Sequence, residues 1–148
     1  MVTVAAGITL GVSITGAQQT SFESLDVCER VPSAEIAKAL SGRPVDARPV
    51  NVKGLTAARC VYGIEIEGTR RAFVAWVNPV ADYDELRKVS TPPVTDVKGV
   101  GDDAFATTDK DTKRVSVTAR ARGKATVQVT SERMERAQAA ARVALSKF

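Results

Sequence analysis

Histidine is absent from the 148-residue chain. It is the commonest general base and metal ligand in proteins, so its absence excludes Ser-His-Asp triads, Cys-His dyads and zinc sites that contain histidine. Aromatic residues are also few, with one Trp, two Tyr and four Phe, so the core is expected to consist mainly of Val, Ala, Leu and Ile. No pair of carboxylates has a spacing typical of a hydrolase. We therefore expect no enzymatic activity, no cofactor and no metal.

The composition of the chain is ordinary for a single soluble domain, with 44% apolar and 26% charged residues. The net charge of +4 permits contact with phosphates or anionic polymers. However, the basic residues are mixed with 17 acidic ones and are not interleaved with aromatic side chains. Because nucleic-acid binders combine dense basic patches with aromatic stacking, no nucleic-acid partner is expected.

The N-terminal residues 2–17 carry no charge. This run is shorter than the roughly 20 residues that cross a bilayer, and small residues stand at −3 and −1 of a cleavage site after Ala17. No Lys or Arg precedes the run, as one normally does in a signal peptide. A signal peptide or membrane-proximal anchor over residues 1–17 is expected, with a first strand or a true membrane span as alternatives. Residues 18–26 would form a linker, and residues 27–148 a single α+β domain.

The two cysteines, Cys28 and Cys60, match neither a zinc spacing nor a Cys-x-x-Cys redox motif. In an exported protein such a pair forms a disulfide, whereas two buried free thiols would be the alternative in a cytosolic protein. Closing a loop of this length would stabilise the fold by about 3–4 kcal/mol. Asp26 and Val27 stand where a lipid-attachment motif requires small residues. The cysteines thus favour a secreted or cell-envelope location without lipidation of Cys28.

Three helices are predicted from capping residues and apolar periodicity. The first begins with Ser33 as N-cap and ends at Ser41-Gly42, and the second begins with Asp82 as N-cap and runs to Val89. The third has Ser131 as N-cap. Its buried stripe is expected to comprise Met134, Ala137, Ala141, Ala144, Leu145 and Phe148.

Two β-hairpins are predicted from period-two alternation. The first pairs residues 60–66 with residues 71–77, and the second pairs residues 115–121 with residues 125–129. Apolar residues on both faces of the segment 71–77 predict a central strand covered on both sides. Short strands are expected at Val50–Val52 and near Phe105. These elements predict an antiparallel sheet of two hairpins plus short strands, flanked by three helices.

The second hairpin allows a sharp prediction of which side chains are buried. Val115, Val117, Val127 and Val129 are expected in the core, and Arg120 and Arg122 at the surface. A register slip of one residue would exchange the two faces of the hairpin.

A glycine-rich segment, Gly99-Val100-Gly101-Asp102-Asp103, precedes the second hairpin. It lacks the third glycine and the following helix of a phosphate-binding loop, and it carries two acids where phosphate would lie. The nearby aspartates also lack the Asp-x-Asp-x-Asp-Gly run of a calcium loop. We therefore interpret the segment as a structural turn.

Two groups of residues are candidates for ligand binding. The first, on the polar side of the second hairpin, comprises Arg114, Arg120, Arg122 and Lys124. Clustered guanidinium groups bind phosphate or carboxylate, although a solvated surface is the alternative. The second comprises Tyr62 and Trp76, which together with Phe73 would line an apolar pocket between sheet and helix or simply belong to the core. An anionic partner is expected to bind Arg120, Arg122 and Lys124.

Three segments together resemble a known group of proteins. They are Cys28 ahead of Pro32–Gly42, Cys60-Val61-Tyr62 at the start of a strand, and Gly99–Phe105 ahead of the last hairpin. Over residues 26–147 the chain resembles small exported and lipoprotein domains of actinobacteria, and the extracellular sensor domains of some mycobacterial serine/threonine kinases. The resemblance implies a Cys28–Cys60 disulfide and a PsbP/Mog1-like sandwich, and it implies neither an enzyme nor a particular ligand.

These features predict a non-enzymatic, exported binding or sensor module whose partner is an envelope protein or an anionic polymer. The alternative is a structural accessory subunit that docks on a membrane or envelope protein through its sheet. A continuous exposed apolar patch would favour docking on a protein.

Overall fold

The computed structural model describes residues 21–91 and 93–148, which form one antiparallel sheet and four helices. The helices are α1 (Val27–Arg30), α2 (Ser33–Ala39), α3 (Asp82–Val89) and α4 (Met134–Leu145). The strands are β1 (Arg43–Pro49), β2 (Ala58–Ile66), β3 (Thr69–Asn78), β4 (Val94–Asp96), β5 (Asp103–Thr108), β6 (Val115–Ala121) and β7 (Ala125–Ser131). The predicted α+β class is confirmed. The expected signal peptide or anchor over residues 1–17 lies outside the described residues.

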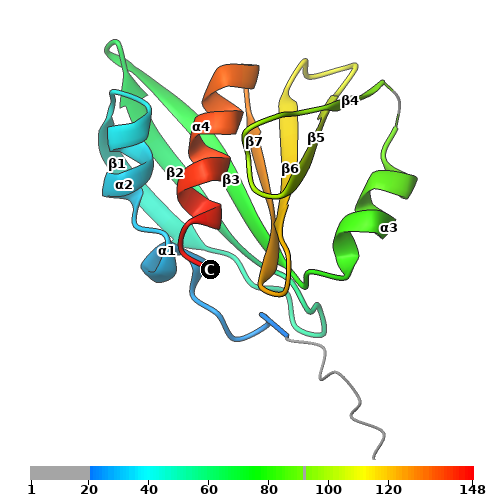
Figure 1. Cartoon of the computed structure of the whole chain (residues 1–148). Helices are drawn as coiled ribbons and strands as arrows, with labels where there is room; N and C mark the ends of the chain where they lie inside the picture. Colours follow the sequence, from blue (N-terminus) through cyan, green and yellow to red (C-terminus); the bar gives the residue numbers. More distant parts are fainter. Residues whose placement is uncertain (1–20, 92) are drawn as a thin grey trace, which may run out of the picture.

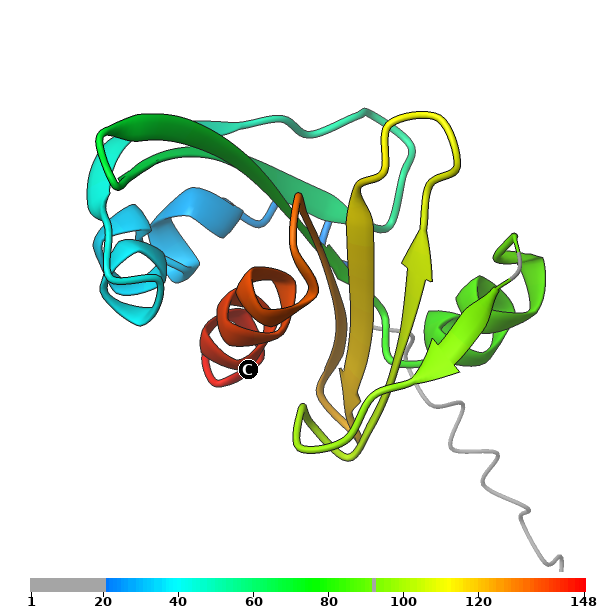
Figure 2. The same ribbon diagram turned by 90° about the horizontal axis from the view of Figure 1, so that it is seen from above.

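The sheet consists of two meanders, β1-β2-β3 and β4-β5-β6-β7, in the order β1-β2-β3-β7-β6-β5-β4. The antiparallel pairing of β3 with β7 joins them, with Trp76 opposite Gln128 and Val77 opposite Val127. Helices α1, α2 and α4 lie on one face of the sheet, and α3 lies on the other face beside β5 (Figures 1 and 2).

The two predicted hairpins supply the centre of the core. Val117 lies opposite Val129 and Ala119 opposite Val127, and each of these side chains is at most 1% exposed. The predicted burial of the four hairpin valines is confirmed, as is the exposure of Arg122. Helix α4 covers this surface with small residues, which allow a helix to approach a sheet closely. Its buried residues are Ala137, Ala140, Ala141, Ala144 and Leu145.

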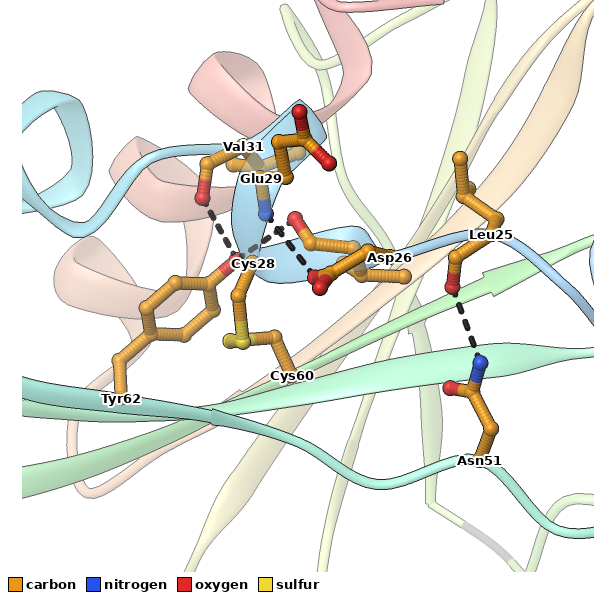
Figure 3. Close-up of a disulfide and its surroundings, with 9 residues drawn as sticks. Leu25, Asp26, Cys28, Glu29, Val31, Asn51, Cys60 and Tyr62 are labelled. Atoms are coloured by element: carbon orange, nitrogen blue, oxygen red, sulfur yellow. Dashed lines mark hydrogen bonds between the residues drawn. A yellow bond between two sulfur atoms is a disulfide. The ribbon is translucent and has the colours of Figure 1, made fainter.

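A disulfide between Cys28 and Cys60 fastens α1 to β2, as predicted (Figure 3). Their Cα atoms are 5.2 Å apart, within the usual range for a disulfide. Beside it, the buried Tyr62 hydroxyl donates a hydrogen bond to the Val31 carbonyl at 2.8 Å. Burial raises the pKa of Tyr62, which moves the titration of the phenol still further from neutral pH. The disulfide and Tyr62 therefore hold the same short helix against β2.

Strand β1 was not expected from the sequence pattern. The segment 43–54 was predicted to be irregular with a strand at Val50–Val52, but the strand is Arg43–Pro49. Pro44 and Pro49 suggested a break, yet proline is tolerated on an edge strand because its missing N–H costs no ladder bond there. Every residue of β1 is exposed, and its register shifts between Pro44 and Asp46. Prolines and an irregular register make it unfavourable for a further strand to pair with this edge of the sheet.

The helix starts also differ from the predicted caps. Ser33 and Asp82 are the first helical residues rather than N-caps, and Ser131 is the last residue of β7. The N-caps of α2, α3 and α4 make no side-chain capping hydrogen bond, so packing rather than capping determines where these helices begin.

The additional helix α1 is the one with a side-chain cap, in which the Asp26 carboxylate accepts a hydrogen bond from the Glu29 amide at 3.0 Å. Asp26, the last residue of the expected linker over residues 18–26, is thus the N-cap of this helix. Phe22 and Leu25 pack against the core, and the Phe22 amide donates to the Thr56 carbonyl at 2.8 Å.

The glycine-rich segment is a structural turn that joins β4 to β5 and contacts α4. Val100 is 1% exposed, and the Gly99 carbonyl accepts a hydrogen bond from Arg142 Nε at 2.8 Å. Gly101 has a φ of +62°, and a Cβ there would lie 2.5 Å from the Arg120 carbonyl oxygen and 2.6 Å from Leu145 Cδ2. The second glycine therefore permits close contact between this turn, β6 and α4.

Replacing Cys28 and Cys60 together by serine should lower the free energy of unfolding by about 3–4 kcal/mol, because the unfolded chain regains the entropy of an open loop. Urea denaturation followed by far-UV circular dichroism measures this loss. The reduced wild-type protein is the control and should show a similar loss. A decrease below about 1 kcal/mol in both would contradict the stabilising role of the bond.

Gly101→Ala should destabilise the protein more than Gly99→Ala. Both glycines have positive φ, but nothing lies within 4 Å of a Cβ at Gly99. Gly99→Ala should therefore cost only the backbone strain of about 1 kcal/mol, whereas Gly101→Ala should cost about 2 kcal/mol more because of steric overlap. Thermal or urea unfolding of the two variants tests this, and equal losses would refute the close packing of Gly101.

Candidate functional site

Among the described residues, no helix covers β2 and β3 on one face of the sheet (Figure 2). Residues directly opposite in antiparallel strands share a face. On the face without a described helix over β2 and β3, one row of directly opposite residues crosses β5, β6, β7, β3 and β2. The row is Phe105, Thr118, Gln128, Trp76 and Arg59. Helix α3 covers its β5 end, where the Tyr83 and Phe105 ring centroids are 5.4 Å apart.

A second row on the same side begins at the edge strand. Arg48 of β1 lies opposite Val61 of β2, which lies opposite Val74 of β3. Val61 and Val74 are half-buried, as are Trp76 and Arg59, while Arg48 is exposed. We refer to these five residues, Arg48, Arg59, Val61, Val74 and Trp76, as the open face. It combines a small aliphatic surface, the single tryptophan of the chain and two arginines.

The guanidinium of Arg59 stacks on the indole of Trp76, with its central carbon 4.6 Å from the ring centroid. Its Nε is buried and has no hydrogen-bond partner in residues 21–91 and 93–148. Among the described residues neither Arg59 nor Arg48 forms an ion pair. A stacked guanidinium keeps its in-plane N–H groups free for an acceptor. The open face therefore carries positive charge that no carboxylate of the described chain neutralises.

Neighbouring arginines of the sheet are neutralised. Arg43 pairs with Glu65 at 2.8 Å, and Arg70 pairs with Asp46 at 2.9 Å. The second pair lies over Gly63, where a Cβ would clash with the Asp46 carboxylate and the Arg70 guanidinium. Glycine at this position leaves room for the ion pair. Arg48 and Arg59 differ from these two arginines in having no carboxylate partner among the described residues.

The structure does not bring the four predicted basic residues together. Arg114 lies before the start of β6 and donates from Nη2 to the Ala72 carbonyl at 3.0 Å. Arg120, Arg122 and Lys124 lie at the opposite end of β6 and in the turn that follows. The predicted exposure of Arg120 is wrong, because its side chain is only 22% exposed. Arg120 packs over the Tyr83 ring, with its guanidinium carbon 4.5 Å from the centroid.

Asp103 is the centre of an ion-pair cluster that contacts α3. It accepts from Arg120 at 2.8 Å and from Arg122 at 3.1 Å, and Arg120 also reaches Asp84 of α3 at 3.3 Å. Hydrogen bonds from the two arginines lower the pKa of Asp103. The hydrogen bond to Asp103 raises the pKa of Arg120, and burial raises that of Tyr83. Arg120 and Arg122 therefore already have internal carboxylate partners.

Tyr62 and Trp76 do not line one pocket, which corrects the second predicted group. Tyr62 lies opposite Phe73 on the core side, whereas Trp76 lies opposite Arg59 on the other side. Because side chains alternate between faces along each strand, the sheet separates the two rings. The predicted helix cover on both sides of β3 is wrong for the same reason, since Val74 and Trp76 are only half-buried.

A cavity of about 360 Å³ lies beside the Asp103 cluster and is lined by Tyr83, Arg87, Asp96 and the residues 97–104. Its principal charges are already paired. Arg87 donates to Asp96 at 2.6 Å, which raises the pKa of Arg87, and Asp102 accepts from the Arg122 amide at 2.8 Å. Arg87, Asp96 and Asp103 of this cavity thus have partners of opposite charge, whereas the open-face arginines have none in the described chain.

The described residues contain no group of three or more Cys, Asp or Glu side chains placed to hold a metal ion. Within residues 21–91 and 93–148, no helix has the length and apolar character needed to cross a membrane. No protein-family model matches the chain, and no curated protein or solved structure is significantly similar to it.

Sequence reasoning did not select Arg59 or Arg48. A signal for Arg59 was present, because extending the first hairpin beyond residue 60 places Arg59 opposite Trp76. No comparable signal existed for Arg48, since β1 was expected to be irregular. The open face therefore includes a residue of β1, a strand that the local sequence pattern did not predict.

Asp103→Asn should lower stability at neutral pH and have little effect in acid. The folded-state pKa of Asp103 is depressed, so its contribution is present above the unfolded-state pKa and is lost as the pH falls through the folded value. The difference in melting temperature between wild type and variant should be largest near neutrality and shrink below about pH 4. Asp111→Asn removes a carboxylate without an ion pair among the described residues and is the matched control, which should change the melting temperature at neutral pH less than Asp103→Asn does.

Proposed function

We propose that the protein is an exported, non-enzymatic binding module of the cell envelope and that the open face contacts its partner. The observation that carries this proposal is the stacked Arg59–Trp76 pair beside the exposed Arg48, without a carboxylate partner in the described chain. Tryptophan and arginine are enriched among the residues that dominate binding energy. The partner class that best complements two unpaired arginines is an anionic polymer of the envelope.

The proposed location is supported by the cysteine chemistry and the N-terminal composition. Both cysteines are in the disulfide, and no free cysteine is found in the described part of the chain. Stable disulfides are favoured in oxidising compartments outside the cytosol. The uncharged residues 2–17 are typical of a signal peptide or anchor. The resemblance to small exported actinobacterial domains and kinase sensor domains points to the same compartment.

The alternative function is that of an accessory subunit that docks on an envelope protein through the sheet. It is favoured by Val61 and Val74, which are half-exposed beside Trp76 on the open face. An apolar partner surface would cover these valines, but it would also have to supply carboxylates for Arg48 and Arg59, because unpaired buried charges are costly. Loss of binding at high salt would favour the anionic polymer.

Val74→Glu should remove binding to immobilised cell-wall material of the producing organism, because it places a negative charge at the centre of the open face. Val89→Glu makes the same change on α3, where the side chain is 65% exposed, and should leave binding unchanged. Sedimentation of each protein with the material at low salt measures retention. Thermal unfolding verifies that both variants are folded.

Equal retention of wild type, Val74→Glu and Val89→Glu would contradict the open face as the binding surface. Val61→Glu provides a second substitution on the same surface and should behave like Val74→Glu.

A further inference from the structure

The arginines of the open face are arranged as a pair. Arg48 lies directly opposite Val61, and Arg59 precedes Val61 by two residues on the same strand and face. Arg48 and Arg59 are therefore diagonal neighbours, whose Cβ atoms are expected about 7–8 Å apart in an antiparallel pair. The Arg59 guanidinium is held toward Trp76 on β3, so an anion that contacts both arginines requires the exposed side chain of Arg48 to reach toward it across Val61. Without one, the like charges repel each other.

The surroundings of this pair strengthen its interaction with an anion. Val61 and Val74 form an aliphatic surface at its base, which reduces screening by water near the charges. Trp76 supports the Arg59 guanidinium from one side and leaves its edge N–H groups directed away from the ring. Trp76 thus acts as a positioning residue for Arg59.

The geometry favours phosphate over carboxylate. A carboxylate has two oxygens in one plane, which a single bidentate arginine can already satisfy. A phosphate has oxygens in tetrahedral directions, so it accepts from two guanidinium groups that approach from different strands. The site consists of exposed and half-buried side chains of β1, β2 and β3. One isolated phosphate has few contacts there, whereas a chain of phosphates gains from repeated attachment.

We propose that Arg48 and Arg59, with Arg59 held against Trp76, form a phosphate-binding site for a polymer with repeated phosphate groups. This inference rests on the proposed function and identifies the chemistry of the partner. It differs from the prediction based on Arg120, Arg122 and Lys124, because Arg120 and Arg122 already have carboxylate partners.

The test is binding of long-chain polyphosphate to the full chain, measured by fluorescence anisotropy of the labelled polymer at low salt. Arg48→Gln and Arg59→Gln should each weaken binding by about tenfold or more, as expected for loss of a charge-assisted contact. Arg136→Gln removes the same charge from α4, on the opposite face of the sheet, and should change affinity by less than about twofold. Arg59→Lys should bind with intermediate affinity, because it retains the charge but not the bidentate geometry.

A second readout locates the polymer. Trp76 is the only tryptophan of the chain, so its emission reports directly on this surface. Polyphosphate should change the emission of the wild type and of Arg136→Gln, and increasing salt should reverse the change. Polyglutamate of matched length should bind at least about tenfold more weakly than polyphosphate.

The inference is overturned if the wild type does not bind polyphosphate, if Arg59→Gln and Arg136→Gln weaken binding equally, or if polyglutamate binds equally well. These failures differ from a failure of the proposed function. If cell-wall material retains the wild type and Arg59→Gln but not Val74→Glu, the open face is still the binding surface and the phosphate site is refuted. Circular dichroism of each variant confirms that the fold is intact.

Discussion

The antiparallel pairing of β3 with β7 is the contact on which the rest of the structure depends. It joins residues about fifty positions apart, Trp76 with Gln128 and Val77 with Val127, and turns two separate meanders into one sheet. Because side chains alternate along each strand, a shift of one residue in this pairing would exchange the faces of one meander relative to the other. The single register aligns Val77 with the core valines and places Trp76 on the opposite side.

The two faces that result have different roles. The inner face carries the aliphatic core, the Cys28–Cys60 disulfide and the Tyr62 hydroxyl that holds α1. The outer face is covered by α3 at one end through the Asp103–Arg120 cluster. Its other end carries Trp76 and Arg59. No helix of the described residues covers β2 and β3 there (Figure 2). Stability and proposed binding therefore reside largely on opposite sides of the sheet, so binding residues can change at little cost to the fold.

The distribution of charge follows the same division. Near the edge and around α3, arginines meet aspartate or glutamate, as in Arg43–Glu65, Arg70–Asp46 and Arg87–Asp96. Such exposed pairs contribute little stability individually but leave little charge for an external partner. Arg48, Arg59 and Arg114 have no carboxylate partner among the described residues. Arg114 donates to the Ala72 carbonyl instead, whereas the Nε of Arg59 is buried without a partner in the described part of the chain. Net charge alone does not reveal this difference, because +4 is the balance of many paired charges.

The sequence by itself determined the features that depend on neighbours along the chain. Alternating valines predicted the 115–129 hairpin and its buried face, the spacing of alanines predicted the buried stripe of α4, and the isolated cysteines predicted the disulfide. Tertiary structure decided the rest. The segment Arg43–Pro49 forms a strand despite its prolines because it lies at the edge of the sheet. Arg120 and Arg122 are neutralised by a carboxylate from another segment. Tyr62 and Trp76 lie on opposite faces of the sheet. The physical reason is that edge position, charge partners and shared faces arise from long-range strand pairing, which local periodicity does not encode.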